Sequence, residues 1–153
     1  MLDSFKLFNE KHFAAAKSVI EPLKKTWPND ANLLELEDKI EFEISMETYI
    51  NDGTRFVEEK RYEEGIELYR NVVPKSINYD NAQKLIQETE RKYHLIKYNE
   101  ARALCDKGVN EECIKGLCAA TLLLGDSETE QERVKSTSGY LEHIIKNKKY
   151  SKY

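Results

Sequence analysis

The residue types that most often do chemistry are sparse and well separated in this chain. Its three cysteines, Cys105, Cys113 and Cys118, form no CxxC pair and no Cys/His cluster. A structural zinc site needs four ligands at short spacings, which these cysteines do not supply. An odd count also predicts no disulfide framework. We therefore expect small, buried, reduced thiols, and on that basis a cytoplasmic protein.

The histidines and carboxylates give no catalytic pattern either. His12, His94 and His143 are isolated from one another. Cys105 and His94 are eleven residues apart on one expected helix, roughly 16 Å along its axis, too far for a nucleophile and its base. No carboxylate is identified within an apolar stripe, where burial would raise its pKa for acid–base work. Nucleotide-binding, zinc-protease and hydrolase motifs are absent. The sequence predicts that the protein is not an enzyme and has neither cofactor nor metal.

The composition favours long helices with solvent-exposed faces. Charged residues make up 34% of the 153 residues, whereas there are only 6 glycines and 3 prolines. The net charge of −4 argues against nucleic-acid binding, which needs a concentrated basic face. No run of 18 apolar residues occurs, so no membrane span is expected.

The spacing of apolar residues predicts an all-α fold of about six to seven helices. Two of them are long, near 30–60 and 79–107, with Asn29 or Asp30 and residues 78–80 as the N-terminal caps. Gly108 should end the second long helix. The shorter helices are expected at residues 4–9, from Phe13 to just before Trp27, at 63–73, between Asn110 and Gly125, and at 127–147.

A pattern of small and bulky residues recurs at a spacing of about 48 residues. Repetition at a fixed spacing is typical of helical units stacked on copies of themselves. The matching positions are Ser4, Gly53 and Ala101; Leu7, Phe56 and Leu104; Phe13, Tyr62 and Asn110; Ala16, Gly65 and Cys113; and Ile20, Tyr69 and Leu117.

This pattern resembles the tetratricopeptide repeat (TPR), a helix-turn-helix unit in which small residues let two helices cross closely. The chain departs from that family in its longer repeat, in Asn110, and in Lys11 and Lys60, which stand where the family has glycine. The resemblance implies an array of antiparallel helix hairpins, an α-solenoid. It would form a single domain over 1–147, with units at about 1–28, 30–77 and 79–125, a capping helix at 127–147 and a basic tail at 148–153.

The family resemblance also implies a function, which is to hold a peptide or protein segment on a concave face formed by the first helix of each unit. Self-association through the ends of the array is a further expectation. By position in the repeat, the expected partner-binding residues are Glu47, Ile50, Asn51, Thr54, Glu58, Leu95, Tyr98, Asn99, Arg102 and Asp106.

Two alternatives remain open at this point. The chain could be a regulatory or structural segment of a larger multidomain protein, or a small dedicated chaperone of the secretion type. A carboxylate clamp like that of co-chaperones is not expected, because only Asn51 matches the clamp positions and the cations are missing.

Overall fold

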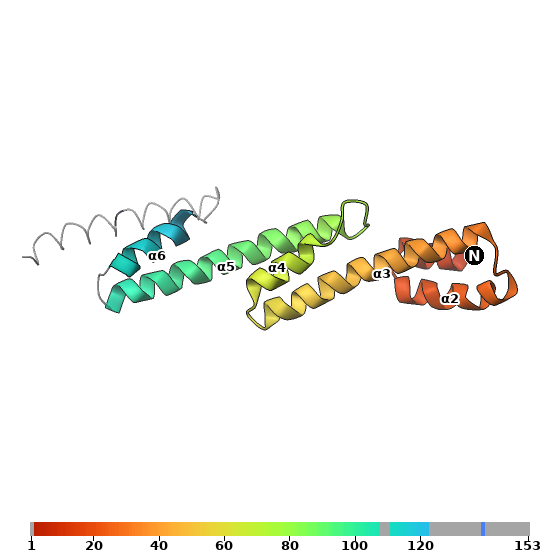
Figure 1. Ribbon diagram of the computed structural model, residues 1–153, viewed down its shortest axis with the longest axis horizontal. Coiled ribbons are helices and arrows are strands. Elements are labelled where there is room, and N and C mark those ends of the chain that lie inside the picture. Colours follow the sequence, from red (N-terminus) through yellow and green to blue (C-terminus); the bar gives the residue numbers. More distant parts are fainter. Residues whose placement is uncertain (1, 108–110, 123–138, 140–153) are drawn as a thin grey trace, which may run out of the picture. The chain divides into compact units, whose positions relative to one another are not determined.

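The computed structural model describes residues 2–107, 111–122 and 139 (Figure 1). The prediction of an all-α fold is confirmed for these residues, none of which lies in a strand. The predicted helix at 127–147, the basic tail at 148–153, Gly108 and Asn110 lie outside the described residues. The helices are α1 (Leu2–Asn9), α2 (Phe13–Thr26), α3 (Ala31–Glu58), α4 (Tyr62–Arg70), α5 (Tyr79–Lys107) and α6 (Glu111–Leu122).

The chain divides into two compact units, Met1–Gln87 and Glu88–Tyr153. The division falls within α5, because the first residues of this long helix pack in the first unit and its last residues pack in the second. The single domain predicted over 1–147 stays a prediction.

The first half of α3 packs against α2, and α2 packs against α1 (Figure 1). Asp30 caps α3 as predicted, since its Oδ1 accepts the backbone N–H groups of Asn32 at 2.9 Å and Leu33 at 3.0 Å. The buried core residues here are Phe13, Ala16, Ile20, Leu33, Leu36 and Ile40.

The second half of α3 packs against α4 and the beginning of α5. Tyr69 lies at the centre of this core, with only 1% of its surface exposed. The other buried members are Met46, Ile50, Ile66, Val72, Ala82 and Ile86. One long helix thus contributes to two successive cores.

Two tight turns join the antiparallel helices of the first unit, and they have the same geometry. Lys11 and Lys60 adopt positive φ angles of 61° and 64°. In the second turn the Arg61 N–H donates to the Phe56 carbonyl at 2.8 Å, and the Lys60 N–H donates to the Val57 carbonyl at 3.0 Å. This is the Schellman arrangement, in which glycine is the usual residue at positive φ. Both lysines therefore hold a conformation that a glycine would adopt more easily.

Two small residues of the repeat, Gly53 and Gly65, lie where α3 and α4 cross. A Cβ atom on Gly65 would lie 2.8 Å from the Gly53 carbonyl oxygen, so α3 and α4 are in close backbone contact. Ser4, Ala16, Ala101 and Cys113 are buried as well. The predicted burial of Gly65 and Cys113 is confirmed. Leu104 was expected to be a bulky core residue, but 57% of it is exposed.

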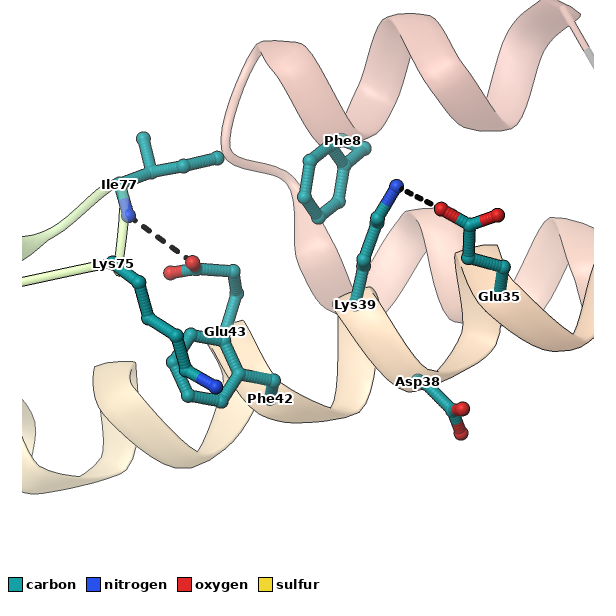
Figure 2. Close-up of a pocket in the computed structure, with 8 residues that line it drawn as sticks. All are labelled: Phe8, Glu35, Asp38, Lys39, Phe42, Glu43, Lys75 and Ile77. Carbon is teal, nitrogen blue, oxygen red and sulfur yellow. Dashed lines mark hydrogen bonds and ion pairs between the residues drawn. The ribbon is translucent and has the colours of Figure 1, made fainter. Parts of the chain in front are cut away.

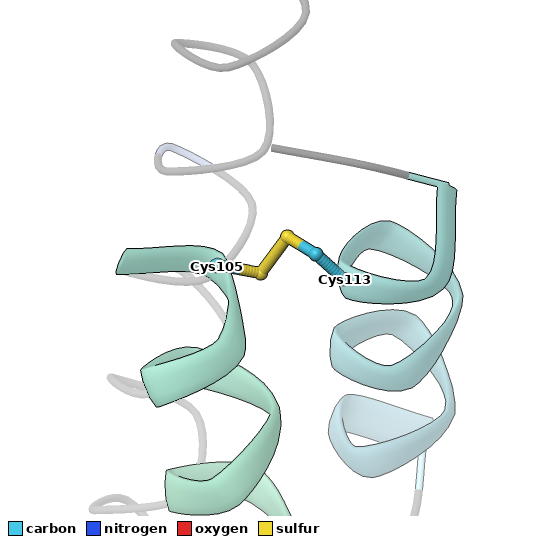
Figure 3. Close-up of a disulfide and its surroundings, with 2 residues drawn as sticks. All are labelled: Cys105 and Cys113. Atoms are coloured by element: carbon cyan, nitrogen blue, oxygen red, sulfur yellow. A yellow bond between two sulfur atoms is a disulfide. The ribbon is translucent and has the colours of Figure 1, made fainter. Parts of the chain in front are cut away.

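In the second unit, the end of α5 packs against α6 through Tyr98, Ala101, Cys105, Cys113 and Leu117. Cys105 and Cys113 form a disulfide (Figure 3). The prediction of three reduced thiols is therefore wrong for this pair, and only Cys118 is a free thiol. The two helices bring the Cα atoms to 5.0 Å, a separation suited to a disulfide, which spacing along the sequence alone does not reveal.

Candidate functional site

The predicted partner-binding residues occupy two separate faces, one on α3 and one on α5. The exposed members on α3 are Glu47, Asn51 and Glu58. The exposed members on α5 are Asn99, Arg102 and Asp106, and Leu95 is half-buried. The two groups belong to different units of the chain, so each is considered separately.

Two of the predicted residues, Ile50 and Tyr98, lie in the core. Ile50 is 9% exposed and packs with Met46, four residues earlier on α3. Tyr98 is 4% exposed and packs with Ala101 on α5. Residues three or four apart share a helix face, so these side chains follow the apolar stripe of their helices. Both side chains are therefore part of the cores of their units, and their assignment to a partner-binding face stays a prediction.

Thr54 makes internal contacts rather than presenting a free hydroxyl. Its Oγ1 donates to the Ile50 carbonyl at 2.9 Å and lies 3.0 Å from the hydroxyl of Tyr69. Because Tyr69 is buried, this contact satisfies a polar atom of the core. Thr54 therefore supports the α3–α4 packing.

A more suitable concavity lies elsewhere in the first unit, where a pocket of about 460 Å³ opens between three segments (Figure 2). We call it the α1–α3 groove. The end of α1, the middle of α3 and the loop between α4 and α5 form its walls. Its lining residues are Phe8, Glu35, Asp38, Lys39, Phe42, Glu43, Lys75 and Ile77.

The floor of the α1–α3 groove is apolar. Phe8 and Phe42 are half-buried, so each ring presents part of its surface to the pocket. Ile77 is 41% exposed, although it is a large aliphatic residue. The Lys75 Nζ lies 4.5 Å from the centroid of the Phe42 ring, which places a positive charge on an aromatic surface.

One wall of the groove depends on Glu43, a buried carboxylate in the middle of α3. Only 3% of Glu43 is exposed. Its carboxylate accepts hydrogen bonds from Ser76 Oγ at 2.7 Å, the Ile77 backbone N–H at 3.1 Å and Asn78 Nδ2 at 3.5 Å. Ser76 Oγ also accepts the Asn78 backbone N–H at 3.0 Å. These bonds hold the α4–α5 loop against α3 and so position Ile77 beside the pocket (Figure 2).

The rim of the groove is charged. Lys39 donates to Glu35 at 2.6 Å, one turn away on α3 (Figure 2). This hydrogen bond, together with the positive charge of Lys39, lowers the pKa of the Glu35 carboxyl below its ordinary value. The exposed Asp38 carboxylate adds a further negative charge. The rim thus offers both charge signs next to an apolar floor.

The groove was not predicted from the sequence, although the sequence does contain an indication of the buried Glu43 in its wall. Glu43 continues the apolar stripe of Leu36 and Ile40 at helical spacing and precedes Met46, which is also buried. The prediction that no carboxylate lies in an apolar stripe is therefore wrong. A glutamate in such a stripe indicates a buried polar contact, but its partners lie more than thirty residues away in sequence.

Two kinds of feature are absent from the described residues. No described group of three or more His, Cys, Asp or Glu residues is arranged to hold a metal ion. Within the same part of the chain, no helix has the length and apolar character that crossing a membrane requires.

Comparison with known proteins identifies no relative. No family model matches the chain, and neither a curated protein nor a solved structure matches it significantly.

Proposed function

We propose that this chain is a non-catalytic interaction scaffold that binds a peptide or protein segment in the α1–α3 groove. The observation that carries the proposal is the juxtaposition of Phe8, Phe42 and Ile77 around one open pocket. Pockets that hold ligands are commonly apolar hollows of roughly 300–1,000 Å³ with a few polar groups that fix orientation. The groove, at about 460 Å³, falls within that range.

The proposed scaffold is a TPR-like array of helix hairpins. Three features support it: the burial of the small residues at matching positions, the backbone contact between Gly53 and Gly65, and the identical turns at Lys11 and Lys60. The recurrence of one turn geometry at the repeat spacing supports a repeated unit, because unrelated turns have no reason to share it.

The groove favours a segment with at least one large apolar side chain flanked by charged residues. The apolar side chain would displace water from the two aromatic rings and Ile77, which supplies most of the binding free energy. Lys39 and Asp38 on the rim would orient the flanking charges and disfavour segments whose charges stand in the reverse order.

The experiment that tests this function uses selection from a displayed peptide library with the whole chain as bait. Two variants are compared, Ile77→Glu in the groove and Leu34→Glu on α3. Leu34 is a matched control because it is a large aliphatic residue, is also 41% exposed and does not line the groove. We expect selected peptides to lose at least tenfold in affinity with Ile77→Glu and to keep their affinity with Leu34→Glu.

Two results would contradict the proposal. One is a library from which no peptide is enriched over a bait-free control. The other is a set of enriched peptides whose affinity is unchanged by Ile77→Glu. Circular dichroism of both variants checks that the helices are retained, so that a loss of binding is not a loss of folding.

A second candidate, self-association, is favoured by the outer face of α1. Leu2 is 89% exposed and Phe5 is 44% exposed, and both line a shallow hollow with Lys6, Asn9 and Glu10. Exposed apolar side chains in a cluster are typical of a contact surface. If two copies associate here, the mass measured by light scattering should rise with concentration, and Phe5→Lys should keep the chain monomeric.

A further inference from the structure

In the second unit a disulfide joins two helices at a position where the corresponding helices of the first unit are held together by side-chain packing alone. Cys105 on α5 and Cys113 on α6 form a disulfide (Figure 3). Cys105 is 3% exposed and Cys113 is 1% exposed. The bond therefore lies inside the interface of the two helices.

The position of this bond in the repeat is informative. Cys113 corresponds to Gly65, and Cys105 follows Leu104 as Val57 follows Phe56. In the first unit, the Val57 Cγ2 atom would lie 2.6 Å from a Cβ atom on Gly65, so the valine side chain fills the space that glycine leaves open. The corresponding space in the second unit holds two sulfur atoms. The same helix crossing is thus maintained by apolar packing in one unit and by a disulfide in the other.

The described core around this disulfide contains few large side chains. Apart from the two cysteines, its members are Tyr98, Ala101 and Leu117. Leu104, which matches a half-buried phenylalanine in the first unit, is 57% exposed. Gly116 approaches Ala101 without close contact, because a Cβ atom on it would lie 3.5 Å from the alanine Cβ. Among the described residues, the covalent link thus lies at the centre of the α5–α6 core.

We propose that the Cys105–Cys113 disulfide is a redox-sensitive link that controls how firmly α6 is ordered on α5. A cellular or added dithiol is the reductant. One of its thiolates attacks one sulfur of the disulfide and forms a mixed disulfide, and the other cysteine leaves as a thiolate. The second thiol of the reductant then releases the remaining cysteine. In total, two electrons and two protons pass from the dithiol to Cys105 and Cys113, and the dithiol becomes a disulfide.

Burial determines how this exchange takes place. An attacking thiolate cannot reach either sulfur while the helices are packed, so α6 must first separate locally from α5. After reduction the same separation occurs more often, because the covalent bond between the two helices no longer opposes it. The reverse exchange with a small disulfide restores the link. The proposal is independent of the α1–α3 groove, whose residues all belong to the other unit.

The experiment measures hydrogen exchange by mass spectrometry on the whole chain, before and after reduction with dithiothreitol. Alkylation first counts free thiols, and we expect one in the oxidised chain, at Cys118, and three after reduction. We expect backbone amides of residues 101–107 and 113–122 to exchange at least tenfold faster after reduction. Amides of α3 and α4, whose crossing contains no cysteine, should be unchanged.

Two variants distinguish reduction of the Cys105–Cys113 disulfide from other effects of the reductant. Cys118→Ser removes the exposed thiol and should respond to dithiothreitol as the original chain does. The double variant Cys105→Val with Cys113→Gly copies the Val57–Gly65 pair and should exchange at the same rate with and without the reductant. The proposal is overturned if the purified chain alkylates at all three cysteines without reduction, or if reduction leaves the exchange of α6 unchanged.

Discussion

Gly53 on α3 and Gly65 on α4 lie opposite each other at a helix crossing that leaves no room for a side chain on either residue. A Cβ atom on Gly53 would lie 2.7 Å from Tyr69 Cε1 and 3.0 Å from the Gly65 carbonyl oxygen. A Cβ atom on Gly65 would lie 2.6 Å from Val57 Cγ2 and 2.8 Å from the Gly53 carbonyl oxygen. Each glycine is thus in contact with the backbone of the other helix, and that backbone cannot move without separating the helices.

Gly65→Ala should destabilise the first unit despite the better helix propensity of alanine. In an exposed helix the change would stabilise by about 1 kcal/mol. Here the added methyl group would overlap a backbone oxygen and a packed valine, and overpacking of this kind typically costs about 1–3 kcal/mol. We expect a net loss on the order of 1 kcal/mol in the free energy of unfolding, measured by urea denaturation with the fluorescence of Trp27, the single tryptophan, as the signal.

Gly116→Ala provides the matched control on α6. Its added Cβ atom would lie 3.5 Å from the Ala101 Cβ, an ordinary van der Waals distance. The variant should keep or increase the helix content and the melting temperature measured by circular dichroism. If both substitutions stabilise, the close approach of α3 and α4 is not present in solution.

Lys60→Gly should stabilise the chain, because Lys60 has a φ angle of 64° in the turn between α3 and α4. The left-handed conformation costs a residue with a side chain roughly 1–2 kcal/mol. Glycine avoids this cost but loses more conformational freedom on folding, which offsets part of the gain. We expect a net gain of roughly 0.5–1 kcal/mol in the free energy of unfolding.

Lys60→Ala distinguishes this cause from the removal of a positive charge. Alanine keeps the strained backbone, so this variant should not be more stable than the original chain. Equal stabilisation by alanine and glycine would show that charge, and not backbone conformation, limits stability at this turn.

The helices of the first unit could be predicted because their signals are local. Asp30 is a strong capping residue just before an apolar stripe, and it caps α3 in the structure. Lys11 and Lys60 stand where the family resemblance implies a turn, and both have positive φ angles in the structure. The small residues at Gly53 and Gly65 indicated a helix crossing, since only small residues allow so close an approach.

The groove and the disulfide could not be predicted, because both depend on contacts between distant segments. Phe8 and Ile77 line the same pocket although they lie at opposite ends of the first unit's sequence. Cys105 and Cys113 are paired by the packing of α6 on α5. Ile50 has the position of a groove residue in the repeat but also lies on the apolar stripe of α3, where it is buried.

Glu43→Ala should destabilise the first unit and disturb the α1–α3 groove. The substitution leaves the Ser76 hydroxyl, the Ile77 N–H and the Asn78 amide without the carboxylate that accepts their hydrogen bonds. Unsatisfied buried polar groups cost about 1–3 kcal/mol. We expect a loss of about 2–3 kcal/mol in the free energy of unfolding, measured by urea denaturation. Affinity for any groove-binding peptide should fall in parallel, because Ile77 is no longer held in position.

Glu47→Ala is the control for this prediction. Glu47 is one turn further along α3 and is exposed, so its removal should change stability by less than about 0.5 kcal/mol. Glu43→Gln keeps the size of the side chain and one acceptor oxygen. Its loss in the free energy of unfolding should lie between those of Glu47→Ala and Glu43→Ala. A loss of stability as large for Glu47→Ala as for Glu43→Ala would exclude a special role for the buried carboxylate.

The ion pair between Lys17 on α2 and Glu41 on α3 should make a small, pH-dependent contribution to stability. Their side chains lie 2.9 Å apart. The hydrogen bond from Lys17, followed by its charge, lowers the pKa of Glu41 below its ordinary value of 4.5. The hydrogen bond to Glu41, followed by the charge of that residue, raises the pKa of Lys17 above 10.5. The side chains of Lys17 and Glu41 are 40% and 53% exposed, so solvent screens the pair and we expect a small effect.

The direction of the pH dependence follows from these shifts. Because the pKa of Glu41 is lower in the folded chain, its contribution is fully present above pH 4.5 and is lost as the pH falls through the folded value. Because the pKa of Lys17 is raised, its contribution is present below pH 10.5 and is lost only at higher pH. Lys17→Met should therefore lower the melting temperature at pH 7, and the difference should vanish in strong acid. Lys25→Met, on the same helix, should show no such pH-dependent difference, and a difference for Lys17→Met that persists in strong acid would rule out the ion pair as its cause.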